Sequence, residues 1–124
     1  MSVQRFASPL PLPFSRAVRA GDFLFLSGQV PMDANGQVVR GDIQTQTHAV
    51  MARICESLAV AGASLKDVVR VTVWLADLAD FAGFNEAYAT HFAKEHLPTR
   101  STVEARLALD VGVEIEVQAY LPDR

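Results

Sequence analysis

The spacing of apolar and polar residues predicts the strands and helices of this chain, because apolar residues alternate along a half-buried strand and recur every three to four residues along a helix. In residues 15–30, two apolar runs flank Ala20-Gly21-Asp22, an arrangement typical of a β-hairpin. The second run, residues 23–30, is apolar almost throughout and predicts a strand covered on both faces. Three prolines in residues 8–13 predict an extended lead-in before the first strand, and Asn35-Gly36 predicts a projecting loop.

Apolar residues then recur at the spacing of a helix. Asp42 is a suitable N-cap for a helix running to about Ala61, and Gly62 is expected to end it, because glycine readily adopts the left-handed conformation that follows a helix. A second helix is predicted to begin at Asp77 or Asp80. The apolar stripes comprise Ile43, Val50, Met51, Ile54 and Leu58 in the first helix and Phe81, Phe84, Tyr88 and Phe92 in the second.

Three further segments are predicted to be strands, namely residues 67–77, 97–107 and 113–121. A turn is expected at residues 109–112, between the last two. Alternation is clearest in the first of the three. There, one face is expected to consist of Val69, Val71, Val73 and Leu75, and the other of Val68, Arg70, Thr72 and Trp74.

The resulting order is β-β-α-β-α-β-β, which predicts an α+β fold with one sheet and both helices packed on one of its faces. At 124 residues the chain is expected to form a single domain over residues 1–124. So short a chain leaves the other face of the sheet bare. Because that face carries valines and phenylalanines, we expect a symmetric oligomer to cover it.

Composition narrows the partners and the compartment. The formal net charge is −3 and the lysines and arginines are scattered, which argues against a nucleic-acid partner. No segment approaches the roughly 20 apolar residues of a membrane-spanning helix, and the N-terminal residues lack the pattern of a signal peptide. The single cysteine, Cys55, is expected to be a small buried hydrophobic residue and fits a reducing compartment. We therefore expect a cytoplasmic protein.

Arg100 is the first candidate for chemistry. Its guanidinium stays charged at any working pH and can grip a carboxylate with two parallel N–H donors. Pro98 stiffens the approach to it, and Ser101 and Thr102 place hydroxyl and backbone amide groups beside it. The alternative is a surface arginine at the start of a strand, loosely paired with a neighbouring acid.

Glu114 and Glu116 are two residues apart on a predicted strand, so they share one face. Val113, Ile115 and Val117 take the other face, against the helices. In a subunit interface, burial and mutual repulsion would raise the pKa of one carboxyl group toward the range of a general acid or base. On a face exposed to solvent, the pair would have no special role.

The remaining polar residues give weaker signals. Asn85, on the second predicted helix, could hydrogen-bond a substrate or only a loop carbonyl. Gly28 stands alone, without the glycine-rich pattern of a nucleotide-binding loop. The three histidines form no i,i+4 pair, and with one cysteine a zinc site is not predicted. We expect neither a metal nor a cofactor.

Three stretches of the chain resemble the signatures of one family. They are AGDFLFLSGQVPMD (residues 20–33), GASLKDVVRVTVWLADLADFAGFNEAYATHF (residues 62–92), and LPTRSTVE (residues 97–104) followed by VEIE (residues 113–116). In this order, they resemble the Rid family of reactive intermediate deaminases, also called the YjgF family. The resemblance implies a chorismate-mutase-like fold with a mixed sheet, assembled as a homotrimer with active sites between subunits.

The same resemblance implies an activity. Members hydrolyse enamines and imines to 2-keto acids and ammonia without a metal or cofactor, and 2-iminopropanoate and 2-iminobutanoate are the expected substrates. Arg100 would clamp the carboxylate of the imino acid, and Glu114, from a different subunit, would activate the attacking water or return a proton to the departing amine. Gly28 and the backbone near Thr102 would line the cleft, with Asn85 as a secondary contact.

The chain departs from the family pattern in three places. Phe14 stands where many active members have a tyrosine whose hydroxyl faces the substrate; a phenyl ring walls the pocket but donates no hydrogen bond. Thr102 stands where several members have a cysteine. The stretch between Arg100 and Glu114 is one residue shorter than in close relatives, so we expect a bulge or a shorter turn there. Glu116, on the same face as Glu114, is the alternative acid or base.

Two other interpretations stay open. The substrate is larger, of the 2-aminomuconate or aminoacrylate type, in a pocket reshaped at Phe14; or the protein is a non-enzymatic trimeric module that binds small carboxylates or regulates partner proteins. A binding module would need Arg100, whereas only an enzyme would need Glu114. A plain structural subunit would need neither residue.

Overall fold

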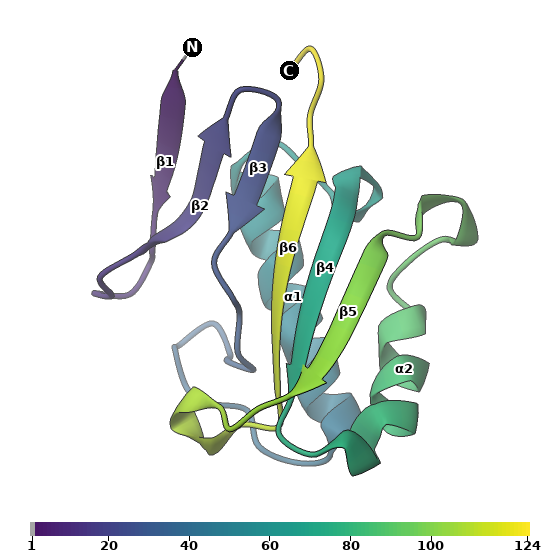
Figure 1. Cartoon of the computed structure of the whole chain (residues 1–124). Helices are drawn as coiled ribbons and strands as arrows, with labels where there is room; N and C mark the ends of the chain where they lie inside the picture. The colour runs from purple at the N-terminus through teal and green to yellow at the C-terminus, as the bar shows by residue number, and fades with distance from the viewer. Residues whose placement is uncertain (1) are drawn as a thin grey trace.

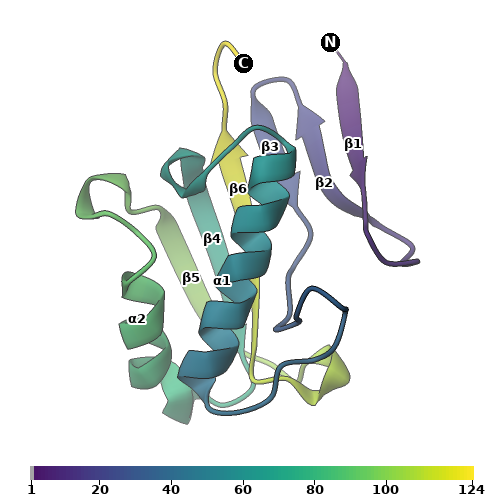
Figure 2. The same cartoon turned by 180° about the vertical axis from the view of Figure 1, so that it is seen from behind.

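The computed structural model describes residues 2–124, which form one six-stranded mixed sheet and two α-helices. The strands are β1 (Val3–Ala7), β2 (Ser15–Ala20), β3 (Phe23–Leu26), β4 (Val68–Leu75), β5 (Thr99–Glu104) and β6 (Val113–Tyr120), and the helices are α1 (Ile43–Val60) and α2 (Phe81–Ala89). The strand order is β1-β2-β3-β6-β4-β5, and only the β4–β5 pair is parallel among the pairs described. Both helices lie on the same face of the sheet, behind it in Figure 1 and in front of it in Figure 2, as the sequence predicts.

The first strand is absent from the predicted order. β1 pairs antiparallel with β2, from Val3 opposite Ala20 to Ala7 opposite Ser15. The proline-rich residues 8–13 therefore connect two strands, and their interpretation as a lead-in before the first strand is wrong. Most side chains of β1 are exposed, so this edge strand lacks the apolar alternation that marks a half-buried strand.

β3 is shorter than predicted and is covered on one face only. Leu24 and Leu26 are buried, whereas 46% of Phe23 and 40% of Phe25 is exposed. Beyond Leu26, the backbone N–H of Ser27 still donates a hydrogen bond to Arg16 of β2, and Gln29 forms an isolated bridge with β6. The phenylalanines make the segment apolar throughout, but within a single chain they face outward.

Helix α1 begins and ends where the sequence predicts. Asp42 is the N-cap, and its carboxylate accepts a hydrogen bond from the backbone N–H of Thr45 at 2.8 Å. Gly62 follows the C-cap with a φ of 79°, a conformation that glycine adopts without strain. The prediction that Cys55 is buried is wrong. Its side chain is exposed, because Cys55 lies outside the stripe of α1 that packs on the sheet.

The two candidate caps of the second helix have separate roles. Asp80 is the N-cap residue of α2, although its side chain accepts no hydrogen bond there. The side chain of Asp77 instead accepts from the backbone of Ala79 and caps the 3₁₀ turn that precedes α2. Phe84 and Tyr88 of this helix are buried, and Phe92 is buried just beyond its end.

A bulge inverts the start of β4. The register of this strand with β6 shifts between Val68 and Arg70, so that Val68 is buried and Val69 is exposed, opposite to the prediction. From Val71 onward the predicted alternation holds. The turn before β6 is a 3₁₀ turn at Ala108–Asp110, which overlaps the turn predicted at residues 109–112.

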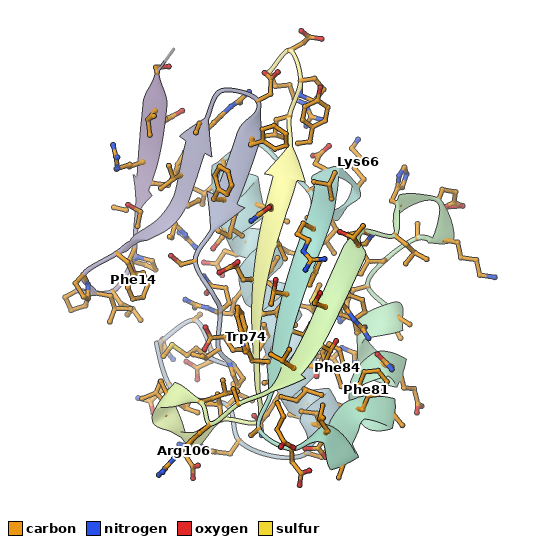
Figure 3. The ribbon with its side chains drawn as sticks, viewed as in Figure 1. Phe14, Lys66, Trp74, Phe81, Phe84 and Arg106 are labelled. Carbon is orange, nitrogen blue, oxygen red and sulfur yellow. The ribbon has the colours of Figure 1, made fainter. Side chains whose placement is uncertain are left out.

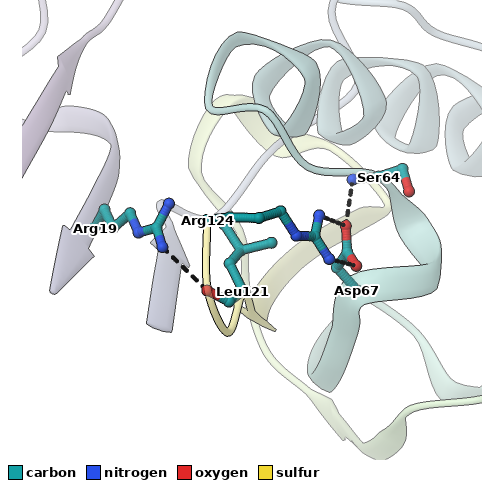
Figure 4. Close-up of polar contacts among 5 residues, drawn as sticks. All are labelled: Arg19, Ser64, Asp67, Leu121 and Arg124. Carbon is teal, nitrogen blue, oxygen red and sulfur yellow. Dashed lines mark hydrogen bonds and ion pairs between the residues drawn. The ribbon is translucent and has the colours of Figure 1, made fainter. Parts of the chain in front are cut away.

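Side-chain contacts attach the end of the chain to the sheet (Figure 4). Arg124 donates two hydrogen bonds, of 2.7 and 3.0 Å, to the buried carboxylate of Asp67, which also accepts from the backbone N–H of Ser64 at 3.0 Å. Arg19 donates to the backbone carbonyl of Leu121 at 3.0 Å. Among residues 2–124, no helix has the length and apolar content needed to cross a membrane.

Candidate functional site

Arg100 lies on the helix-covered face of the sheet. It is the second residue of β5, the edge strand, and stands opposite Val71 of β4, whose side chain is buried in the core. Since paired residues of neighbouring strands share a face, Arg100 points toward α2. There, one guanidinium nitrogen (Nη2) donates a hydrogen bond of 2.7 Å to Oδ1 of Asn85.

Three aromatic rings of α2 surround the same guanidinium. The Arg100 Cζ atom lies 4.9 Å from the ring centroid of Tyr88, 5.3 Å from that of Phe84 and 5.8 Å from that of Phe81. Figure 3 labels Phe81 and Phe84, which lie on α2 beside β5. All three distances are within the range of cation–π attraction. The rings and Asn85 form what we call the Arg100 cradle.

The Arg100 cradle contains no acidic residue. The ion pairs found among residues 2–124 are Arg16–Glu56 and Arg124–Asp67, so a loose pairing of Arg100 with a neighbouring acid, the alternative left open by the sequence, is not present. A guanidinium has five N–H donors, and Asn85 accepts from only one of its nitrogens. The remaining in-plane donors are available to a planar anion such as a carboxylate.

Glu114 and Glu116 lie on the opposite face. In the register of β6 with β4, Glu114 stands opposite Trp74 and Glu116 opposite Thr72; Trp74 is labelled near the centre of the sheet in Figure 3. Both glutamates are partly buried, and Val113, Ile115 and Val117 alternate with them toward the helices, as predicted. Burial raises the pKa of Glu114, and the charge of Glu116 raises it further.

Gly28 lies beside Glu114, and Phe14 lies near Gly28. A β-carbon built on Gly28 would collide with the Glu114 carboxylate, so the absence of a side chain at Gly28 lets the two segments meet. Gly28 and the half-exposed Phe14 also line a cavity of about 60 Å³ under the loop of residues 8–13. Apolar side chains, among them Leu10 and Met32, form much of its wall.

The predicted site residues therefore fall into two groups. Arg100, Asn85 and Thr102 belong to the helix-covered face, and the Thr102 hydroxyl is buried without a hydrogen-bond partner among the described residues. Glu114 and Glu116 form the second group, on the other face of the sheet, with Gly28 against the Glu114 carboxylate and Phe14 in the cavity that Gly28 also lines. Ser101 also shares that open face, where its hydroxyl accepts a hydrogen bond from Arg70 at 2.7 Å. A single protomer does not bring the guanidinium of Arg100 and the carboxylate of Glu114 together.

Sequence reasoning treated Phe81, Phe84 and Tyr88 only as an apolar face and missed their contact with Arg100. Their spacing holds the signal in hindsight: residues 81, 84, 85 and 88 share one face of a helix, so the amide of Asn85 lies among aromatic rings. No cluster of three or more histidine, cysteine, aspartate or glutamate side chains suited to a metal ion occurs in residues 2–124.

The sheet order and the helices on one face define an α+β protein of the chorismate-mutase-like class. A family model described as Endoribonuclease L-PSP matches residues 7–121. A RutC family protein of Pyrococcus horikoshii is 49% identical over 116 residues, which cover 91% of each chain. The chain belongs to this family, the YjgF/RutC/Rid group, which includes imine deaminases.

Solved structures agree with this assignment. The crystal structure of yeast Mmf1 superposes with a TM-score of 0.91 at 34% identity, covering 97% of this chain and 99% of that one. The Rid family protein YyfA from Yersinia pestis superposes with a TM-score of 0.89 at 31% identity, covering 97% of this chain and all of the other. Both structures match the whole sheet and both helices rather than a part of the fold.

Proposed function

We propose that this protein is a hydrolytic deaminase that converts small imino and enamino acids, such as 2-iminopropanoate and 2-iminobutanoate, to 2-keto acids and ammonia. The observation that carries the proposal is the Arg100 guanidinium, held by neutral groups and without an acidic partner among the described residues. We place the reaction in the cytoplasm, the compartment that the single cysteine favours. The net charge of −3 offers no basic surface for RNA, so ribonuclease activity is not part of the proposal.

Arg100 is the carboxylate clamp in this mechanism. Two parallel N–H donors on a guanidinium match the two oxygens of a carboxylate and fix both its position and its plane. Since the imine carbon is bonded directly to that carboxylate, the clamp also fixes the carbon that water attacks. Orientation of this kind lowers the entropic part of the barrier.

Glu114 is the proton carrier. Its raised pKa makes the carboxylate a stronger base than a free glutamate, so that it can take a proton from the attacking water. As the new C–O bond forms at the imine carbon, Glu114 passes the proton it took from water to the nitrogen, which gives the carbinolamine and restores the carboxylate. Glu114 then takes the proton of the carbinolamine hydroxyl as the C=O bond forms and gives it to the nitrogen as the C–N bond breaks, which releases ammonia. The sum is imine plus water giving keto acid plus ammonia.

Arg100 and Glu114 can act on one substrate only if they come from different subunits, because they lie on opposite faces of the sheet. We propose a homotrimer in which one subunit supplies Arg100, Asn85 and Thr102, and the next supplies Glu114, Gly28 and Phe14. The open face of the sheet supports an assembly, since large apolar side chains are exposed on it. These include Phe23, Phe25, Val103 and Tyr120.

Subunit mixing tests this arrangement. Arg100→Ala and Glu114→Gln proteins, each inactive alone, are unfolded, mixed in equal amounts and refolded together. If each site uses Arg100 of one subunit and Glu114 of the next, about one site in four is intact in a random cyclic trimer, and the mixture recovers about a quarter of wild-type activity. A mixture without activity, with trimers confirmed by sedimentation, would refute a shared site.

The activity itself is tested by coupling. A pyridoxal-phosphate amino-acid dehydratase generates the imine from serine or threonine, semicarbazide traps imine that is still free, and release of the keto acid is followed. Wild-type protein should divert the imine from semicarbazide to keto acid, and Arg100→Ala should not. Failure of the wild type to compete with semicarbazide for the imine from serine and for the imine from threonine would exclude the proposed activity.

A longer substrate, of the 2-aminomuconate or aminoacrylate type, is the second candidate. Phe14 supports it, because a phenyl ring where many members have a tyrosine changes the wall of the pocket and offers the substrate no hydrogen bond. A binding module without catalysis makes a different prediction: Glu114→Gln would leave its carboxylate affinity unchanged, and there would be no turnover to lose.

A further inference from the structure

Arg100 is unusual in how little polar contact holds it. A long arginine side chain loses rotamer entropy when it is fixed, and buried arginines are commonly fixed by a carboxylate. Here the hydrogen bond from Nη2 to Asn85 is the one polar contact found for the guanidinium within residues 2–124. A carboxylate partner would hold the side chain more firmly, but it would occupy the same N–H donors that a ligand needs.

We propose that Tyr88 is the positioning residue for Arg100, and that its ring holds the face of the guanidinium by a cation–π contact while the in-plane N–H donors stay free for a ligand. The ligand is the substrate carboxylate, so the inference rests on the proposed function. A cation–π contact uses the face of the guanidinium and a carboxylate uses its edge. Both can therefore be satisfied at once.

Tyr88 is the best placed of the three rings. Its centroid is nearest to Arg100 Cζ, at 4.9 Å, and only 6% of the residue is exposed. Its own position is set by Phe84 on one side and Phe92 on the other, with ring centroids at 5.3 and 4.9 Å. Phe81, by contrast, is 5.8 Å from Arg100 and 42% exposed. Cation–π contacts are stronger where water is excluded, which favours Tyr88 and the fully buried Phe84 over Phe81. Of these two, Tyr88 is the nearer to Arg100.

The ring of Tyr88, rather than its hydroxyl, performs this role. The hydroxyl is buried and has no hydrogen-bond partner among the described residues. Burial raises the pKa of Tyr88 to about 12, although the charge of Arg100 acts in the opposite direction. The phenol therefore stays neutral at working pH and adds no anion that would compete with a carboxylate for Arg100.

Graded fluorination of the ring tests the contact without changing its shape. Position 88 is first changed by Tyr88→Phe and then carries the mono-, di- and trifluorinated forms of that ring, because each fluorine withdraws electron density from the face. The probe is 2-oxobutanoate, a carboxylate that cannot be hydrolysed, with its Kd measured by calorimetry. We expect Tyr88→Phe to stay within about twofold of wild type and the trifluorinated ring to weaken binding by about three- to thirtyfold.

The kinetic readout separates positioning from general damage. With 2-iminobutanoate, kcat/KM should fall by at least the factor by which Kd for 2-oxobutanoate rises, because a loosened Arg100 both binds and orients the substrate less well. The matched control is the same fluorinated series at Phe92, a buried ring that touches Tyr88 and is not among the rings within reach of Arg100. Fluorination there should leave Kd unchanged.

Each other result overturns the inference. A flat Kd across the series at position 88, an equal change at Phe92, or an effect that persists in an Arg100→Ala background would show that the ring acts by packing alone. A wild-type protein that does not bind 2-oxobutanoate would also overturn it. If the wild type binds 2-oxobutanoate but hydrolyses no imine, the proposed function fails, while the Kd series still decides the role of Tyr88.

Discussion

Gly28→Ala should separate catalysis from stability at the Glu114 side of the site. Gly28 does not have a left-handed backbone, since its φ is not among the positive values of the chain, so alanine introduces no backbone strain. The added β-carbon would lie 3.1 Å from Cδ and 3.3 Å from Cγ of Glu114, and closer still to its Oε2 atom. These contacts force the carboxylate to move.

The expected magnitudes follow from which atoms must move. The displaced group is the end of a flexible side chain, so the free energy of unfolding should change by less than about 1 kcal/mol. The carboxylate itself must retreat by about 1 Å, and a misplacement of that size in a reacting group lowers the rate by about 100-fold. The added β-carbon meets Glu114 and not the Arg100 clamp, so affinity for 2-oxobutanoate should stay the same.

The assay compares kcat for 2-iminobutanoate, Kd for 2-oxobutanoate and the thermal unfolding midpoint in wild type and Gly28→Ala. Loss of kcat at constant Kd and stability is the expected pattern. Glu114→Gln provides the reference, because it removes the proton carrier without adding volume. A Gly28→Ala protein with the kcat of the wild type would refute the reasoning. A rise in Kd with an unchanged kcat would show that the β-carbon blocks the cleft rather than moving Glu114.

Three further predictions concern stability. Burial raises the pKa of Glu114, so the folded state is favoured at low pH and loses stability as the pH rises through the folded-state pKa. Glu114→Gln should therefore raise the melting temperature at pH 7 and leave it unchanged below the ordinary carboxyl pKa. The hydrogen bond from Arg124 holds the pKa of Asp67 below its ordinary value. Asp67→Asn should therefore lower the free energy of unfolding by about 1–3 kcal/mol at pH 7. Urea titrations should show that this difference from wild type disappears as the pH falls through the lowered pKa of Asp67. Burial and the charge of His48 lower the pKa of His91, whose Nε2 atom lies 2.8 Å from Nδ1 of His48. The free energy of unfolding should therefore decrease as the pH is lowered from roughly 7 to 5. In denaturant titrations at each pH, His91→Gln should make this decrease smaller.

Most of the fold could be predicted because the local signals agree with the final packing. The cap at Asp42 and the glycine after α1 bound a helix whose apolar stripe packs on the sheet. The alternation in β6 assigns a face to every residue of that strand. Where local pattern and tertiary burial point the same way, the pattern is sufficient.

The errors arise where burial is not local. β1 pairs at the edge of the sheet and buries little, so its residues carry no alternation to detect. Phe23 and Phe25 are apolar but open to one side of a single chain, and a sequence pattern cannot tell a side chain buried by its own chain from one that a partner would bury. The bulge at Val69 adds one residue to the ladder and inverts the faces before it.

The same reasoning explains why the site residues could be named but not assembled. β6 alternates, so Glu114 could be assigned to the face away from the helices, and it lies there. β5 reads TRSTVE and contains no apolar alternation, so nothing in it assigns Arg100 to either face; only its pairing with the buried Val71 does so. That pairing places the two charged groups on opposite sides of one sheet, and a sheet cannot fold to join its own faces. A reaction that uses both groups therefore requires a second copy of the chain, which is why the subunit-mixing experiment tests the mechanism more directly than either single substitution.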